Sequence, residues 1–197
     1  DRLLLKMPAR KNTVASLTAY LAALTGGHVV LLAPPGRPAR LLAQRWDPDV
    51  IAADALREVR PGTRHDLHPD LALLLSTSGS TGSPKLVRLS YANLLSNAAG
   101  IAEYLRLGSD DRALTSLPLH YCYGLSVVHS HLLVGAGLVL TEGSVVDECF
   151  WRLAADAGAT VRLHARFDLD EMLRRIEAAR MTLEMAVAPI ALALANH

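Results

Sequence analysis

The chain has 197 residues, of which 51% are hydrophobic and 20% charged, and its formal net charge is +1. This composition allows one packed domain, or part of a larger one, and argues against disorder. The small net charge gives no reason to expect nucleic acid or an acidic membrane as a partner, and no apolar run of the sequence is long enough to predict a membrane span.

Short apolar runs alternate with amphipathic segments along the chain, and the alternation predicts an α/β fold with a mostly parallel sheet flanked by helices. Strands are predicted at 2–6, 28–33, 50–53, 71–75, 85–90, 137–142, 160–165 and 182–188, and another ends within 113–119. Helices are predicted at 12–24, 38–46, 91–105, 123–134, 145–157, 168–180 and from 190. The polar segment 57–70 is expected to be a surface loop.

Helix boundaries follow from the capping residues. Asn12 or Thr13 is expected to cap the first helix, and Gly26-Gly27 to end it. Ser90 is expected to cap helix 91–105. The apolar helix 123–134 is expected to be buried.

The segment Ser76–Lys85, with the sequence STSGSTGSPK, follows the apolar run 71–75. Glycines let backbone N–H groups approach a phosphate, hydroxyls add donors, and a lysine adds a positive charge. A solvated Gly/Ser loop is the alternative interpretation. The segment differs from a Walker loop, because Pro84 precedes Lys85 and a β-favouring run follows it. We therefore expect a phosphate-binding loop that lies between two strands.

The same segment resembles the phosphate-binding signature of the AMP-forming, adenylate-making enzymes, which include acyl-CoA synthetases, luciferases and peptide-synthetase adenylation domains. The stretch LPLHYCYGL at 117–125 is similar to a second element of that family, and 166–195 is similar in architecture to a third. The resemblance covers residues 71–197 and implies the fold of the large N-terminal domain of acyl-CoA synthetases, in incomplete form.

The resemblance also implies roles for individual residues. The ATP phosphates would be held by Thr77, Ser78, Gly79, Ser80, Thr81, Gly82 and Lys85. Tyr121 stands where the family usually has a histidine, and His120 where it has an aromatic residue, so each is expected to border the substrate pocket or simply to pack. Because the order is exchanged, no acid–base role is assigned to His120. No residue is assigned as a metal ligand.

The family reaction that the resemblance implies has two steps. A carboxylic acid, such as a fatty acid or another acyl acid, attacks ATP to give an acyl-adenylate and pyrophosphate, with Mg²⁺ neutralising the phosphates. Coenzyme A, or the pantetheine of a carrier protein, then takes the acyl group. The family's adenine, magnesium and ribose elements and its mobile C-terminal domain would come after residue 197, so the isolated fragment is expected to be inactive.

An internal similarity at an offset of 23 residues relates the segment from Gly135 to the segment from Gly158, and it aligns Asp147-Glu148 with Asp170-Glu171. Two ordinary strand–helix units would explain it, as would a duplication or a recombination junction near 158–160. Two alternatives to an enzyme stay open. A nucleotide-binding module without catalysis would have the phosphate loop but not the adenine and lysine elements, and a recombined or engineered scaffold would account for the internal similarity.

Cys122 and Cys149 are too few for a disulfide framework or a zinc site, which favours a reducing, cytoplasmic setting. Neither has a histidine at a spacing that indicates a nucleophile, so both are expected to be buried apolar side chains. Self-association into a homo-oligomer is expected if a sheet edge or an apolar face is left uncovered.

Overall fold

The computed structural model describes residues 3–6, 12–34, 36–52, 56–62, 65–76, 85–141, 143, 146–158 and 174. Its strands are β1 (Leu3–Lys6), β2 (Val29–Leu32), β3 (Val50–Ala52), β4 (Leu56–Glu58), β5 (Leu71–Ser76), β6 (Leu86–Ser90), β7 (Arg112–Thr115) and β8 (Gly137–Leu140). Its helices are α1 (Val14–Thr25), α2 (Arg37–Trp46), α3 (Tyr91–Leu105), α4 (Cys122–Leu133) and α5 (Glu148–Asp156).

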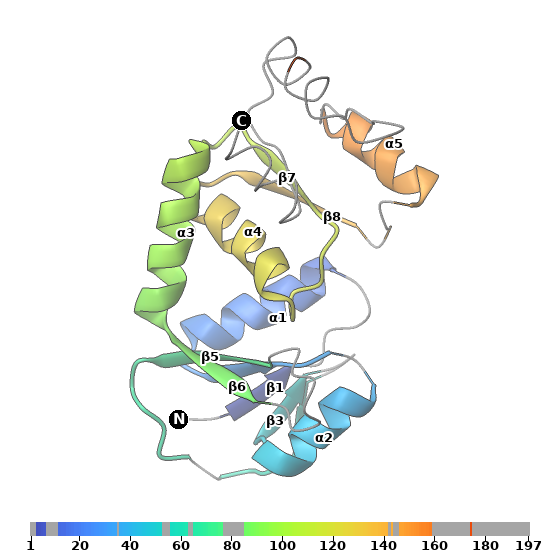
Figure 1. Ribbon diagram of the computed structural model, residues 1–197. Coiled ribbons are helices and arrows are strands. Elements are labelled where there is room, and N and C mark those ends of the chain that lie inside the picture. The colour runs from blue at the N-terminus through green and yellow to red at the C-terminus, as the bar shows by residue number, and fades with distance from the viewer. Residues whose placement is uncertain are drawn as a thin grey trace.

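Two sheets enclose a layer of helices (Figure 1). The larger sheet has the order β4-β3-β1-β2-β5-β6, and β7 and β8 form a separate pair. Helices α1 and α4 lie between the two sheets, whereas α2 covers the opposite face of the larger one. The pairs β1–β2, β1–β3, β2–β5 and β7–β8 are parallel, which confirms the prediction of a mostly parallel α/β fold. At the two edges of the larger sheet, β4 pairs antiparallel with β3, and β6 pairs antiparallel with β5. The sequence did not indicate these two antiparallel pairs.

Strand β2 carries the core on both of its faces. Successive side chains of a strand point to opposite faces of the sheet. Val30 and Leu32, both 0% exposed, pack in the cluster that includes residues of α1 and α4. Val29 and Leu31 pack in the second cluster, with α2. The continuous apolar run of β2 follows from this two-sided burial.

Several boundaries agree with the sequence. Helix α3 spans the predicted residues, and the side chain of Ser90 caps it. Thr13 is the residue that caps α1, by accepting a hydrogen bond from the Ser16 N–H at 3.1 Å, and Gly26 ends this helix. Asn12 does not cap α1 and has another role, described below.

The prediction of a loop over residues 57–70 was wrong at its start, because β4 spans Leu56–Glu58 and pairs antiparallel with β3. The charged residues of this segment favoured a loop in the sequence. An outer strand accommodates them because one of its edges and one of its faces can contact water. The prediction for helix 123–134 was wrong in part. One side of α4 is buried, but Leu132 and Leu133 are 38% and 47% exposed.

Asp49 immediately precedes β3 and forms hydrogen bonds with the segment that follows β4. Its side chain is fully buried, and its backbone carbonyl accepts hydrogen bonds from the N–H groups of Val59 and Arg60. His65 Nε2 lies 3.1 Å from the carboxylate of Asp49. The angle at this nitrogen is unsuitable for a hydrogen bond to the carboxylate. The two groups form an ion pair only when the imidazole is protonated. The Arg60 side chain also forms an ion pair with Asp47.

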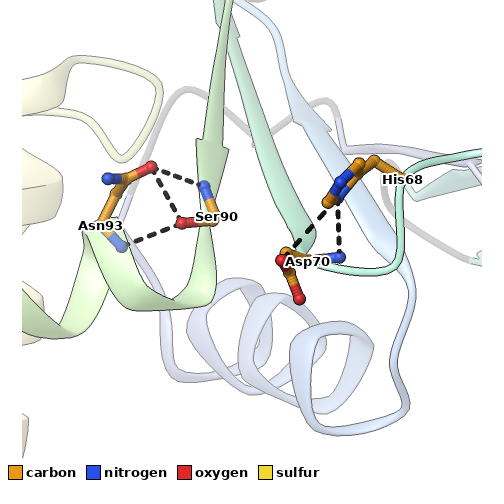
Figure 2. A network of polar contacts seen from close by, with 4 residues as sticks. All are labelled: His68, Asp70, Ser90 and Asn93. Carbon is orange, nitrogen blue, oxygen red and sulfur yellow. Dashed lines mark hydrogen bonds and ion pairs between the residues drawn. The ribbon is translucent and has the colours of Figure 1, made fainter.

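Local polar contacts lie on each side of the base of the β5–β6 hairpin (Figure 2). Ser90 and Asn93 form a capping box, in which Ser90 Oγ accepts from the Asn93 N–H at 3.1 Å and Asn93 Oδ1 accepts from the Ser90 N–H at 3.0 Å. In the segment that precedes β5, the Asp70 N–H donates to His68 Nδ1 at 3.2 Å. The Asp70 carboxylate is 3.9 Å from this same nitrogen, which carries no proton while it accepts, and both side chains are exposed, so this contact adds little.

Most of the second unit of the internal similarity, from Gly158 onward, lies outside the described residues, as do the strands predicted at 160–165 and 182–188 and the helix predicted from 190. The first unit consists of β8 and α5, with Asp147 at the N-cap position of α5 and Glu148 in its first turn. A junction near 158–160 therefore stays a prediction.

We expect the substitution Ser90→Ala to lower the free energy of unfolding by about 1 kcal/mol, because it removes the acceptor for an N–H group in the first turn of α3. Urea denaturation followed by circular dichroism measures the change. Ser109→Ala, at an exposed turn residue after α3, is the matched control and should be near neutral. Equal losses in the two variants would contradict the capping role.

Candidate functional site

The segment that resembles the phosphate loop is framed by two neighbouring strands. Strand β5 ends at Ser76, β6 begins at Leu86, and these two residues are register partners across the antiparallel pair. The prediction that this loop connects two strands is therefore confirmed. Lys85 immediately precedes β6 and is exposed. The other predicted phosphate-binding residues lie outside the described residues, namely Thr77, Ser78, Gly79, Ser80, Thr81 and Gly82.

The second motif forms the turn from β7 into α4. The Tyr121 N–H donates to the Pro118 carbonyl at 3.0 Å, which closes a tight turn around Leu119 and His120. Tyr121 is the N-cap residue of α4 with φ −100° and ψ 127°. Its side chain is 52% exposed and that of Tyr123 is 44% exposed, so both rings can meet a ligand.

His120 differs from its two tyrosine neighbours because it is partly buried. Burial lowers the pKa of this imidazole below its ordinary value of 6.5, because desolvation disfavours the charged form. The ring is therefore neutral at pH 7, with one nitrogen that donates and one that accepts. Within the part of the chain that the structure describes, its buried Nδ1 has no hydrogen-bond partner. A polar ligand group could supply one.

The two motifs meet in the core. Leu75, next to Ser76 at the end of β5, and Leu119, next to His120, belong to the same buried cluster. The end of β5, from which the Ser76–Lys85 segment leaves, and the His120 turn therefore pack against the same hydrophobic core.

Gly124 allows α4 to approach the turn closely. A Cβ atom added to Gly124 would lie 2.8 Å from the carbonyl oxygens of both Leu117 and Pro118. Such contacts are too short for any side chain, and both neighbours are backbone atoms. Only glycine therefore allows this packing.

A buried polar pair joins α1 to α4 behind the turn. The Tyr20 hydroxyl is 2.9 Å from His129 Nε2, and the rings stack at a centroid distance of 5.8 Å. Burial lowers the pKa of His129 to about 4 and raises that of Tyr20, with Tyr91 adding to the second effect. Both groups are therefore neutral at pH 7, and the imidazole tautomer decides which of the two donates.

An apolar groove of about 370 Å³ opens beside this pair. It lies between α1, α3 and α4, and its lining includes Leu24, Leu94, His129 and Leu133. The Tyr91 hydroxyl bridges two of these helices by donating to the Leu24 carbonyl at 2.8 Å.

The expectation that Cys122 and Cys149 are buried was wrong. Both are free thiols and both are exposed. Cys122 is the first residue of α4 and Cys149 lies in the first turn of α5, where one side of each helix meets solvent. Sequence composition could not show on which side of the helix each thiol lies.

Among the described residues, no three His, Cys, Asp or Glu side chains cluster in a way that could hold a metal ion. Within the same ranges, every helix is too short or too polar to cross a bilayer.

One residue near the turn was not recognised from the sequence as functional. Asn12 was considered only as a helix cap, but its side-chain amide contacts the backbone of Thr115 and Leu117. No local signal indicated this contact, because its partners lie more than 100 positions away along the chain. The pairing of His129 with Tyr20 had no sequence signal at all.

Comparison with known families decides the relationship. A sequence profile of the family described as "AMP-binding enzyme" matches residues 42–165, which is more than half of the chain. The chain belongs to the AMP-binding enzyme family. The match includes both motifs of the candidate site, so the resemblance inferred from the sequence is confirmed.

Several of the curated relatives are named as CoA ligases. The indoleacetate–CoA ligase of Aromatoleum aromaticum is 33% identical over 180 residues, which is 88% of this chain and 28% of that protein. The sulfoacetate–CoA ligase of Cupriavidus necator is 39% identical over 89 residues, which is 45% of this chain and 18% of that protein. The matched segments thus span only 18% and 28% of the length of these two relatives.

Solved structures agree on the fold. MbtA of Mycobacterium smegmatis is 25% identical with a TM-score of 0.64, and the match covers 81% of this chain and 37% of that one. A variant of E. coli MenE with bound OSB-AMS is 22% identical with a TM-score of 0.63, and the match covers 90% of this chain and 47% of that one. The predicted likeness to N-terminal domains of adenylate-forming enzymes is thereby confirmed.

We expect Gly124→Ala to lower the free energy of unfolding by about 1–3 kcal/mol, because the new methyl group overlaps two backbone carbonyls that must then move. Thermal or urea denaturation measures the loss. Gly100→Ala is the matched control, since Gly100 is also helical but has nothing within 4 Å of the added Cβ. Alanine should stabilise α3 there by about 0.5–1 kcal/mol. If both substitutions stabilised the protein, the close approach at Gly124 would be refuted.

The low pKa of His129 predicts a pH-dependent stability. Because the folded-state pKa is about 4 and the ordinary value is 6.5, the unfolded chain binds the proton more readily between these values. The contribution is therefore fully present above pH 6.5 and is lost as the pH falls toward 4, by up to about 1.4 kcal/mol per pH unit.

The variant His129→Gln keeps an acceptor for Tyr20 but does not titrate, so the difference in unfolding free energy between wild type and variant should change in that window. Urea denaturation at pH 7, 6, 5 and 4 measures it. If the unfolding free energies of wild type and variant changed by the same amount between pH 7 and pH 4, His129 would not be the cause of the pH dependence.

Proposed function

We propose that the chain forms the phosphate-binding part of an AMP-forming ligase, which activates a carboxylic acid with ATP and transfers it to a thiol. The observation that supports this proposal most directly is the position of the Ser76–Lys85 segment between the paired strands β5 and β6. Ser76 and Leu86 pair at its base and Lys85 stands at its exit, in a chain that belongs to the AMP-binding enzyme family.

The phosphate-binding residues are proposed from the sequence. Backbone N–H groups and hydroxyls of Thr77, Ser78, Gly79, Ser80, Thr81 and Gly82 would donate to the β- and γ-phosphates of ATP, and Lys85 would add a charge-assisted hydrogen bond. The antiparallel β5–β6 pair supports this role, because the register partners Ser76 and Leu86 hold the two ends of the loop side by side.

The proposed chemistry is an in-line displacement. A substrate carboxylate attacks the α-phosphorus of ATP, an acyl–phosphate bond forms, and pyrophosphate leaves. Positioning and charge stabilisation carry such a step, so no protein nucleophile is required. Mg²⁺, when bound with ATP, neutralises part of the phosphate charge. His120 and Tyr121 would border the adenylate or the acyl group, with the neutral His120 ring offering a hydrogen bond.

The acceptor thiol is proposed to be coenzyme A, because the curated relatives described above are CoA ligases; a carrier-protein pantetheine would present the same thiol. Names of relatives give a panel of candidate acids: sulfoacetate, ferulate, indoleacetate and 2-succinylbenzoate. A fatty acid completes the panel. Two free, exposed thiols fit a reducing compartment, so we propose a cytoplasmic setting. The exposed apolar groove supports self-association into a homo-oligomer.

Residues 1–197 are proposed to be part of the N-terminal AMP-binding domain of this ligase. Further elements of such a domain would supply the adenine and ribose contacts. A duplication or junction near 158–160 would alter the unit that follows α5, and a natural gene that encodes the segment without interruption would refute a recombined origin.

The proposal predicts ATP–pyrophosphate exchange by the protein that carries this chain at its full natural length, with at least one acid of the panel. Lys85→Ala should weaken ATP binding about tenfold or more, because a charge-assisted hydrogen bond contributes about 1.5–3 kcal/mol. Calorimetry with ATP and Mg²⁺ measures binding, and labelled pyrophosphate measures exchange.

Arg88→Ala is the matched control, since it removes the same charge from an exposed position three residues further along, in β6. It should leave ATP binding within about twofold of wild type. Equal weakening by the two substitutions would indicate only a general charge effect. Binding of ATP without exchange on any acid would favour a nucleotide-binding module without catalysis.

A further inference from the structure

Asn12 makes a contact that reaches across the fold. Its side chain is only 8% exposed. Its Nδ2 donates to the carbonyl oxygens of Thr115 and Leu117 at 2.7 and 2.8 Å. An amide NH₂ group has two hydrogens, and here each has its own acceptor. Because Thr13 caps α1, the amide of Asn12 is not needed to cap the helix and is available for this contact.

The two acceptors lie at the start of the turn that carries His120 and Tyr121. Thr115 is the last residue of β7, and Leu117 is two residues further along. On the other side of the turn, Gly124 of α4 packs against the carbonyls of Leu117 and Pro118. The turn is therefore held between the amide of Asn12 and the first turn of α4.

The hydrogen bonds of this segment follow one another along the chain. Asn12 satisfies the carbonyls of Thr115 and Leu117, the Tyr121 N–H satisfies that of Pro118, and the Leu125 N–H satisfies that of Tyr121. Removing the amide would cost each of the two carbonyls a hydrogen bond, at a place where Thr115 is buried and Leu117 is half-buried, which is costly. If the turn moved toward water to replace these bonds, the His120 ring would move with it.

We infer that Asn12 is a positioning residue that fixes the His120–Tyr121 turn relative to α1 and the larger sheet. Its role in a reaction rests on the function proposed above, in which this turn borders the substrate. A displacement of about 1 Å at such a border is enough to slow a reaction strongly. The contact itself exists without substrate and can be tested alone.

Asn12→Asp tests the inference, because the carboxylate has the shape of the amide but cannot donate and faces two carbonyl oxygens. Amide hydrogen exchange, followed by NMR, should become about tenfold faster at Tyr121 and Leu125. Exchange at Val30 and Leu73, in the centre of the larger sheet, should change less than twofold. Asn12→Ser, which keeps a single donor, should give an intermediate effect and provides a second variant if the aspartate does not fold.

A spectroscopic signature separates positioning from plain stabilisation. If the turn opens, His120 becomes hydrated and its pKa, followed by its imidazole NMR signals, should rise toward 6.5 in Asn12→Asp. The signals are assigned by comparison with His120→Gln. Ala22→Gly is the matched control, because it weakens α1 at an exposed position outside the buried cluster that contains Leu119, and it should leave the pKa of His120 unchanged.

Uniformly faster exchange over the whole sheet, or an unchanged pKa of His120, would overturn the inference. In the full-length protein, Asn12→Asp should lower the kcat of pyrophosphate exchange about tenfold or more, with the KM for ATP changed less than about twofold. A wild type without exchange would refute the proposed function, whereas the NMR results would still decide the role of Asn12.

Discussion

The burial of β2 on both faces is the constraint on which the rest of the structure depends. Val30 and Leu32 leave water only if α1 and α4 cover one face, and Val29 and Leu31 only if α2 covers the other. Burying one such side chain contributes about 1.5–3 kcal/mol. Because the parallel neighbours β1 and β5 flank β2, the ends of these strands gather at one edge of the sheet. The signature loop leaves from that edge, after β5.

The helix layer joins the two motifs of the site. Helix α1 contacts the larger sheet through the core and contacts α4 through the pair of Tyr20 and His129. At its start, Asn12 reaches the turn after β7. A change in the packing of α1 would therefore be felt at both motifs, although neither lies on this helix. The neutral state of the Tyr20–His129 pair makes this connection independent of charge at neutral pH.

Much of the fold could be predicted from the sequence because its signals are local. The capping residue Ser90 indicated where α3 begins, and the uninterrupted apolar run of β2 predicted a strand. Local signals could not reveal β4, since its charged residues suit an outer strand as well as a loop. They could not place Cys122, because the exposed side of α4 depends on what packs against the other side. The contacts of Asn12 join residues more than 100 positions apart, and only the fold brings them together.

The free thiol of Cys122 lies one residue beyond Tyr121, at the border of the candidate site, and it is exposed. The other thiol, Cys149, lies on α5, away from the larger sheet (Figure 1). The chain therefore carries a natural attachment point for a fluorophore or spin label beside the turn, and a second one that can serve as a reference. Motion of the turn could be followed in this way without introducing a cysteine.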